Sequence, residues 1–298
     1  MTTLEHQYLA HLFYSDKTIE EVMANNIVIE TNEEPDTSLI NKEKNHQHMD
    51  RYDKQILQKN NENDIYKVIP IDGSGYRGFL IAIYDPSKVR LAITRFPKEK
   101  GELLTTISEV HDAKVAINAS GFHDQDGISD GGTPTGSVIK DGKIIFSEKS
   151  RELYGGIIGF DYNNNLILTK DDAQTALTKY NLKDAVEFGP FLIVNGKPSF
   201  IKGNGGWGIA PRTAIGQRSD GIVLFLIIDG RRVGHSLGAD MVELTRIMTN
   251  YKAINAANLD GGASTTLTVE KNLKNKPGGG FSAKVEQRPL PTAWIVTN

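Results

Sequence analysis

The sequence predicts an α+β fold: a mixed, mainly antiparallel β-sheet core with a few helices, preceded by a helical or stalk-like N-terminal extension. Short apolar stretches joined by turn residues recur from Ile65 onward, which is typical of hairpin-rich sheets. Helical periodicity is clear in only two places. All 29 glycines lie after residue 64, so the chain changes character there. We therefore expect an extension over residues 1–64 and one larger domain over residues 65–298.

The extension has its own composition. Residues 1–64 carry 13 acidic and 6 basic residues, whereas the remainder carries 24 and 28. Ser15 precedes a short amphipathic stretch and is a candidate helix N-cap. Residues 31–64 are polar and rich in Asn, Glu, Lys and His, which predicts a solvated stalk or helical spacer. His46 and His48 fit that solvated tract better than a metal site.

Hairpins account for much of the predicted domain. Asp141-Gly142 and Asn195-Gly196 each stand between two apolar stretches, the pattern of a two-residue hairpin turn. The predicted strands lie at residues 76–84, 89–94, 137–140, 143–146, 157–160, 166–169, 191–194 and 222–228. The last of these is nearly all apolar, so we expect it to be buried and central.

Two stretches have the period of an amphipathic helix. They lie at residues 171–180 and 240–251. In the second, Met241, Leu244 and Met248 share one face, which predicts a helix packed on the sheet.

Composition excludes several classes of protein. With 34 basic and 37 acidic residues among 298, the net charge is −3, which argues against nucleic acid as a partner. The absence of cysteine removes disulfides, thiolate metal sites and thiol nucleophiles. No run of 18 apolar residues occurs, so we expect neither a membrane span nor a signal-peptide core in this sequence. The motifs of P-loops, dinucleotide-binding folds, α/β-hydrolases and zincins are also missing.

Polar residues and glycines stand where several predicted strands end. Asn118, Asp229 and Asp260 each follow an apolar stretch, and Arg212 opens another. Each alone has an ordinary structural reading: a turn-forming side chain for Asn or Asp, and a rim salt bridge for Arg. Together they describe a site for an anionic sugar derivative, because an arginine fork binds phosphate while paired carboxylates serve catalysis at a sugar carbon.

The turn after Asp260 extends this site. In the run Gly261-Gly262-Ala263-Ser264-Thr265, two glycines are followed by hydroxyl side chains. We expect the backbone N–H groups of the two glycines to face an anion as a nest.

A second loop raises the question of a cation. Residues Asp124–Asp130 begin with the D-x-D-G pattern of a calcium loop. The twelfth position is Thr135 rather than the bidentate Glu that an EF-hand needs, so a rim loop of the site is the favoured interpretation and structural calcium the alternative.

The order of these blocks resembles the phosphodiester glycosidase family. That family includes N-acetylglucosamine-1-phosphodiester α-N-acetylglucosaminidases and bacterial exopolysaccharide-biosynthesis-type proteins. The resemblance covers roughly residues 65–298, and Ala119-Ser120 and Ala263 stand where glycines are common in the family. The matching blocks are Asn118-x-x-Gly-Phe, Gly189-Pro190-Phe191-Leu192-Ile193, Arg212-Thr213-Ala214-Ile215-Gly216, Asp229-Gly230-Arg231, Gly238-x-x-x-x-Glu243-Leu244 and Asn258-Leu259-Asp260-Gly261-Gly262.

The resemblance implies a hydrolase that cleaves the sugar C1–O bond of a glycosyl phosphodiester in a cell-envelope or exopolysaccharide glycan. It makes Asp260 and Asp229 the catalytic carboxylates, with Glu243 a third candidate whose plain alternative is a helical pair with Arg246. The implied substrate-binding residues are Asn118 for the sugar and Arg212, Gly261, Gly262, Ser264 and Thr265 around the phosphate.

The resemblance also implies a setting. We expect an extracellular or cell-surface protein that meets a sugar-phosphate or glycan substrate, with contact to a membrane only through an anchor absent from this chain. No cofactor is expected to be required.

Two other functions stay open at this point. A non-catalytic glycan- or teichoic-acid-binding module would keep Arg212 and an aromatic platform such as Trp207, but would not need paired carboxylates. A metal-dependent phosphodiesterase would cut at phosphorus, yet the glycine-rich part of the chain holds only His111, His123 and His235 as histidine ligands. Residues 203–208 are interpreted either as a substrate-gating loop or as a plain connection.

Overall fold

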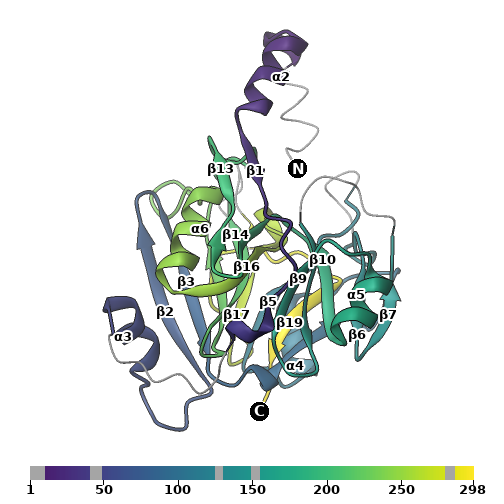
Figure 1. Cartoon of the computed structure of the whole chain (residues 1–298), viewed down its shortest axis with the longest axis vertical. Coiled ribbons are helices and arrows are strands. Elements are labelled where there is room, and N and C mark those ends of the chain that lie inside the picture. Colours follow the sequence, from purple (N-terminus) through teal and green to yellow (C-terminus); the bar gives the residue numbers. More distant parts are fainter. Residues whose placement is uncertain (1–10, 41–48, 125–129, 149–154, 279–285) are drawn as a thin grey trace.

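A computed structural model of the chain describes residues 11–40, 49–124, 130–148, 155–278 and 286–298 (Figure 1). Helices and sheets are both present, which confirms the α+β class. The strand pairs within this described part are antiparallel throughout, so the sheets are less mixed than the sequence led us to expect.

The largest sheet has seven strands and carries one side of the candidate site. One of its interior strands, β15 (Val223–Ile228), is fully buried, as its apolar sequence predicts, because it pairs on both edges and packs on both faces. In spatial order the strands are β12 (Lys197–Pro198), β11 (Phe191–Val194), β16 (Ala253–Asn258), β14 (Arg212–Arg218), β15 (Val223–Ile228), β3 (Tyr76–Ile83) and β2 (Tyr66–Gly73).

Two five-stranded sheets pack around it. One contains β7 (Lys143–Phe146), β6 (Val138–Lys140), β10 (Leu182–Phe188), β8 (Gly156–Asp161) and β9 (Leu166–Thr169). The other contains β18 (Asn272–Leu273), β17 (Leu267–Val269), β5 (Val115–Asn118), β19 (Thr292–Val296) and β4 (Val89–Ile93). A separate two-stranded pair joins β1 (Ile27–Ile29) to β13 (Phe200–Lys202).

The helices lie outside these sheets (Figure 1). They are α2 (Asp16–Ala24), α3 (Arg51–Leu57), α4 (Leu104–Val110), α5 (Ala173–Tyr180) and α6 (Met241–Asn250), with 3₁₀ turns η1 (Thr37–Leu39), η2 (Pro86–Lys88) and η3 (Gly262–Ser264). Both helices predicted from periodicity, α5 and α6, are confirmed. None of the helices in the described ranges is long and apolar enough to cross a membrane.

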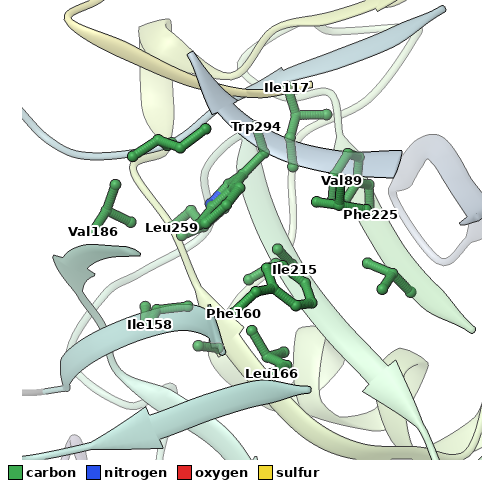
Figure 2. Packing of buried hydrophobic residues seen from close by; sticks show 14 of the residues in the cluster. Val89, Ile117, Ile158, Phe160, Leu166, Val186, Ile215, Phe225, Leu259 and Trp294 are labelled. Carbon is green, nitrogen blue, oxygen red and sulfur yellow. The ribbon is translucent and has the colours of Figure 1, made fainter. Parts of the chain in front are cut away.

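The main hydrophobic core lies where the three sheets meet (Figure 2). Trp294 of β19 is fully buried there, and its ring meets Phe160 of β8 edge-on with centroids 5.5 Å apart. Ile215 and Phe225 from the seven-stranded sheet complete the contact between sheets. This packing fixes the relative positions of the strand ends that carry the polar residues.

The predicted hairpin turns are confirmed by their backbone. Asp141 and Gly142 have φ of 48° and 70°, and Asn195 and Gly196 have φ of 51° and 77°. Two consecutive positive φ values define the turn whose twist matches paired strands, which is why Asp or Asn followed by Gly occurs there.

The N-terminal extension differs from the expected stalk. Ser15 does cap α2, its side chain accepting from the Thr18 N–H at 3.3 Å. Beyond α2, however, β1 pairs with β13 and α3 packs on the large sheet, with Ile56 completely buried. A few apolar residues within a polar tract make these contacts. The average composition of residues 31–64 is polar, so it did not reveal them. His46 and His48 lie outside the described residues.

Candidate active site

The ends of several strands meet at one edge of the large sheet. β14 runs antiparallel to both neighbours, β15 and β16, and Arg212 stands opposite Ile228. The first residue of β14 therefore lies beside the last residues of its two neighbours. Asp229 directly follows β15 and Asp260 lies two residues beyond β16, so the fold brings these residues to a common edge.

Asn118, at the end of β5, joins this edge to the second sheet. It is fully buried, and its Nδ2 donates to the Asp260 carbonyl oxygen at 2.6 Å. Its Oδ1 accepts from Thr213 Oγ1 at 2.8 Å and from the Thr266 N–H at 3.1 Å. The sugar contact suggested for Asn118 stays a prediction, and these bonds show that its side chain holds three strand ends together.

Asp260 is the candidate carboxylate with the most perturbed acidity. Removal from water raises its pKa from 3.8 to about 6, although hydrogen bonds from Ser264 and the Gly261 N–H and the charge of Arg288 oppose the rise. The Gly261 N–H reaches its Oδ1 at 3.0 Å. A carboxyl group of this acidity changes charge close to neutral pH, which is a property of catalytic acids and bases.

Arg212 is a buried cation held by backbone carbonyls. It is 4% exposed; its Nε donates to Ala239 O at 3.0 Å, and its Nη2 donates to Trp207 O and Gly208 O at 2.6 and 2.5 Å. Burial lowers its pKa to about 10, with Arg231 lowering it further and Asp240 raising it, so the group stays charged at neutral pH. Within the described ranges it forms no salt bridge, and Nη1 has no hydrogen-bond partner.

Arg231 is a second cation that the sequence interpretation left without a role. Its guanidinium lies beside Gly262, where an added Cβ would meet the two terminal nitrogens at 3.5 and 3.7 Å. The side chain is exposed, and its charge is felt at Arg212. Two guanidinium groups near one glycine turn form a positive site suited to phosphate.

The Gly261-Gly262 turn serves a purpose other than the predicted nest. The Gly261 N–H donates to the Asp260 side chain, and the Gly262 N–H donates to Pro211 O at 2.9 Å. Both groups are therefore hydrogen-bonded within the protein rather than facing an anion. Gly261 is needed for close approach, because a Cβ there would lie 2.9 Å from Pro211 O.

Asp229 is buried and accepts hydrogen bonds at both oxygens. Its Oδ1 accepts from Asn275 Nδ2 at 3.0 Å and from the Lys276 N–H at 2.9 Å, and its Oδ2 lies 2.8 Å from His235 Nε2. His235, which the sequence marks only as one of three histidines in the glycine-rich part of the chain, is 23% exposed at its side chain. Asp229 thus orients a histidine of the same loop that carries Arg231. The loop folds back to bring the two side chains together, and no local sequence pattern predicts such a turn.

The hydroxyl residues of the turn lie next to Asp260. Ser264 is buried and hydrogen-bonds the Asp260 side chain. Thr265 is also buried, and within the described part of the chain its Oγ1 has no hydrogen-bond partner. Asn275 donates to Thr265 O at 3.0 Å, which ties this turn to Asp229.

Glu243 forms the helical pair that was its plain alternative. Its Oε2 lies 2.5 Å from Nη2 of Arg246 on α6. Arg246, and after it Tyr76, lower its pKa from the ordinary value. In the described residues no contact joins it to Asp229 or Asp260, so it is the weakest of the three carboxylate candidates.

The proposed calcium loop falls largely outside the described residues, which omit 125–129. At its edge, Asp124 pairs with Arg288 Nη2 at 2.7 Å. Arg288 also lies 4.7 Å over the Phe122 ring and acts on the charge of Asp260. Across the described ranges no group of three His, Asp or Glu side chains is placed to hold a metal ion.

Comparison with known proteins supports the expected family. A family model described as phosphodiester glycosidase matches residues 111–297. The SPbeta prophage-derived uncharacterized protein YomE of Bacillus subtilis is 30% identical over 184 residues, which are 57% of this chain and 26% of that protein. The chain therefore spans about a quarter of the length of this curated relative.

Solved structures with the same fold include an enzyme. The catalytic domain of zebrafish N-acetylglucosamine-1-phosphodiester α-N-acetylglucosaminidase, auto-inhibited by its pro-peptide, matches with a TM-score of 0.63 at 19% identity, over 80% of this chain and 85% of that one. A Burkholderia pseudomallei protein described as exported matches with a TM-score of 0.56 at 16% identity, over 75% of this chain and 74% of that one. At such identities the likeness concerns the fold.

Proposed function

Because the chain belongs to the phosphodiester glycosidase family, we propose that it hydrolyses the bond between a sugar C1 and the oxygen of a phosphodiester. The observation that carries this proposal is the neighbourhood of the Asp260 turn. A carboxylate of raised pKa lies beside two guanidinium groups, Arg212 and Arg231, that pair with no carboxylate in the described residues. That combination suits a reaction in which positive charge develops at a sugar carbon and a phosphate leaves.

The cations address the leaving group. Cleavage of the C1–O bond releases a phosphate monoester, which is a weak base and leaves without much protonation, so fixed positive charge replaces a strong general acid in this proposal. Arg212 suits this task because its carbonyl partners hold it in place before substrate arrives, and Nη1 has no partner among the residues that the structure describes. Arg231 is exposed and supplies the second fork.

The carboxylate acts at the sugar. Ionised Asp260 stabilises C1 or activates water in the transition state, and Asp229 orients His235 at the rim of the site. Since the Asp260 pKa is about 6, turnover falls as the pH drops below that value.

The substrate class follows from this chemistry. We propose a sugar phosphodiester of a cell-envelope or exopolysaccharide glycan, met outside the cell, with no cofactor required for the step. The binding-module and phosphodiesterase alternatives remain as outcomes of the test below.

The test is product analysis on UDP-N-acetylglucosamine and on a simple sugar-1-phosphodiester. Free sugar with an intact phosphate product, reduced about 100-fold or more in Asp260→Asn, supports C1–O cleavage at Asp260. Asp112→Asn is the matched control, because Asp112 is an exposed carboxylate paired with Lys271. Release of sugar-1-phosphate would move the chemistry to phosphorus, and binding of the substrate without turnover would favour the module.

A further inference from the structure

The loop over residues 203–208 controls how Arg212 is held. The carbonyl groups of Trp207 and Gly208 at its end accept both bonds of Nη2. Loss of that loop conformation would free the guanidinium to turn, because only the bond from Nε to Ala239 O would remain. The position of a cation for phosphate thus depends on a glycine-rich loop.

That loop is itself held by the N-terminal segment. Asn26 Oδ1 accepts from the Asn204 N–H at 3.1 Å, immediately before β1 pairs with β13. Gly206 has φ of +78°, and a Cβ there would lie 2.5 Å from Asn26 O, so the two backbones are in direct contact. Val28 is 4% exposed and belongs to the hydrophobic cluster against which Trp207 packs.

The segment is fixed at its other end by a buried carboxylate. The Glu30 side chain is 3% exposed and accepts from the Gly155 N–H at 2.9 Å and the Phe191 N–H at 2.5 Å. Lys170 Nζ lies 3.1 Å from the same group. Figure 1 shows β1 running from α2 into the body of the molecule beside β13.

We propose that residues 26–30 are a positioning element of the phosphate site: they clamp the 203–208 loop, which in turn fixes the Arg212 guanidinium. This rests on the proposed function, since it assigns Arg212 to phosphate. The N-terminal segment then supports the site rather than forming a stalk. Loss of its contacts with the 203–208 loop weakens binding of phosphate without unfolding the domain.

The first experiment uses the full chain and inorganic phosphate as the probe, with Kd measured by calorimetry. Asn26→Ala removes the acceptor for Asn204 and is expected to weaken phosphate binding about tenfold, while Asn26→Asp keeps that acceptor and restores it. Ile29→Ala is the matched control, because Ile29 lies on the same strand and is 51% exposed. Arg212→Lys removes the guanidinium group and shows how much phosphate affinity is lost when Arg212 cannot bind at all.

The outcomes separate the two ideas. Phosphate bound by the wild type and weakened by Arg212→Lys, but unchanged in Asn26→Ala, overturns the clamp and leaves the proposed function standing. No phosphate binding by the wild type overturns both. An increase of turnover in Asn26→Ala would also overturn the clamp, because it would mean that the segment obstructs the site.

A second measurement excludes a merely structural effect. In Asn26→Ala, kcat/KM for the sugar-1-phosphodiester should fall about tenfold while the melting temperature changes little, because a displaced Arg212 guanidinium binds the phosphate less well both in the substrate and as it leaves. Hydrogen exchange should accelerate at the Asn204 and Gly206 amides and stay unchanged at Ile215. An unchanged kcat/KM, a melting temperature lowered by several degrees, or faster exchange throughout the core would contradict the proposal.

Discussion

At the residue scale, burial shifts the pKa of both Asp260, which is half-buried, and Arg212, which is buried, and the same few strand ends hold the two side chains. Burial makes the carboxyl group easier to protonate and the guanidinium easier to deprotonate. For Arg212 the ordinary pKa is so high that charge survives. For Asp260 the shift brings the pKa to about 6, so the protonation state of its carboxyl group changes with pH near neutrality.

The raised pKa of Asp260 has a thermodynamic consequence. The folded state disfavours the ionised form, so the carboxylate lowers stability above about pH 6, and the penalty fades as the pH falls toward 3.8. Asp260→Asn is therefore expected to raise the melting temperature at pH 8 by about 2–6 °C. Thermal unfolding between pH 5 and 8 checks this, and a gain independent of pH would contradict the raised pKa.

At the scale of elements, Asn118 connects parts of the chain that lie far apart in sequence. It bonds to a residue that follows β16, to one that precedes β17 and to one that lies on β14. A single buried amide thus sets the distance between two sheets at the edge of the site. Small errors there would move the Asp260 turn relative to Arg212.

A graded series tests this junction. Thr213→Val removes one bond to Asn118 and is expected to cost about 1 kcal/mol, while Asn118→Ala leaves buried groups without partners and should cost about 2–3 kcal/mol. Turnover should fall in the same order. Urea unfolding of both variants provides the measurement, and equal costs would show that Asn118 does not act as a junction.

At the scale of the whole molecule, the N-terminal residues and the sheets form a continuous structure. Asp53 of α3 is 2% exposed and its Oδ1 lies 3.1 Å from Nη2 of Arg218, itself 3% exposed. Lys252 bonds the other Asp53 oxygen, and Asp220 also pairs with Arg218. This buried network fastens α3 to the large sheet.

Removing one member of that network leaves charge uncompensated. Asp53→Ala is expected to destabilise the protein by about 2–4 kcal/mol. Loss of one partner from an isolated buried ion pair costs more, but here Asp220 still pairs with Arg218. Deleting residues 1–25, by contrast, removes α2, which has no buried residue, and should leave stability nearly unchanged. Equal stability of wild type and Asp53→Ala would restore the stalk interpretation.

Much of the fold could be predicted from local sequence signals, and the reason is physical. Hairpins such as Asp141-Gly142 depend on neighbouring residues, and the α6 stripe depends on a period of one turn. The docking of Val28 and Ile56 depends on surfaces formed elsewhere in the chain. Contacts of this kind involve only one or two apolar residues in a polar stretch, so no local sequence pattern predicts them.

The candidate site could also be predicted only in part. Strand ends and the order of blocks pointed to Asp260, Asp229 and Arg212, but no local pattern marks a carboxylate that folds back onto His235. The Gly261 N–H was expected to face an anion, and instead it meets its own neighbour's side chain. Sequence locates the polar residues, while only the folded backbone shows which of them are already occupied.

The place of β19 has a consequence for when the site comes into existence. This strand is the last one along the described chain, yet it lies between β5 and β4, and Thr292 bonds Ser120 beside the Asn118 junction. During synthesis, β5 therefore lacks one neighbour until residues 292–296 have left the ribosome. The site is completed by its final strand, so a nascent chain stopped before that strand would carry the site residues without the geometry that unites them.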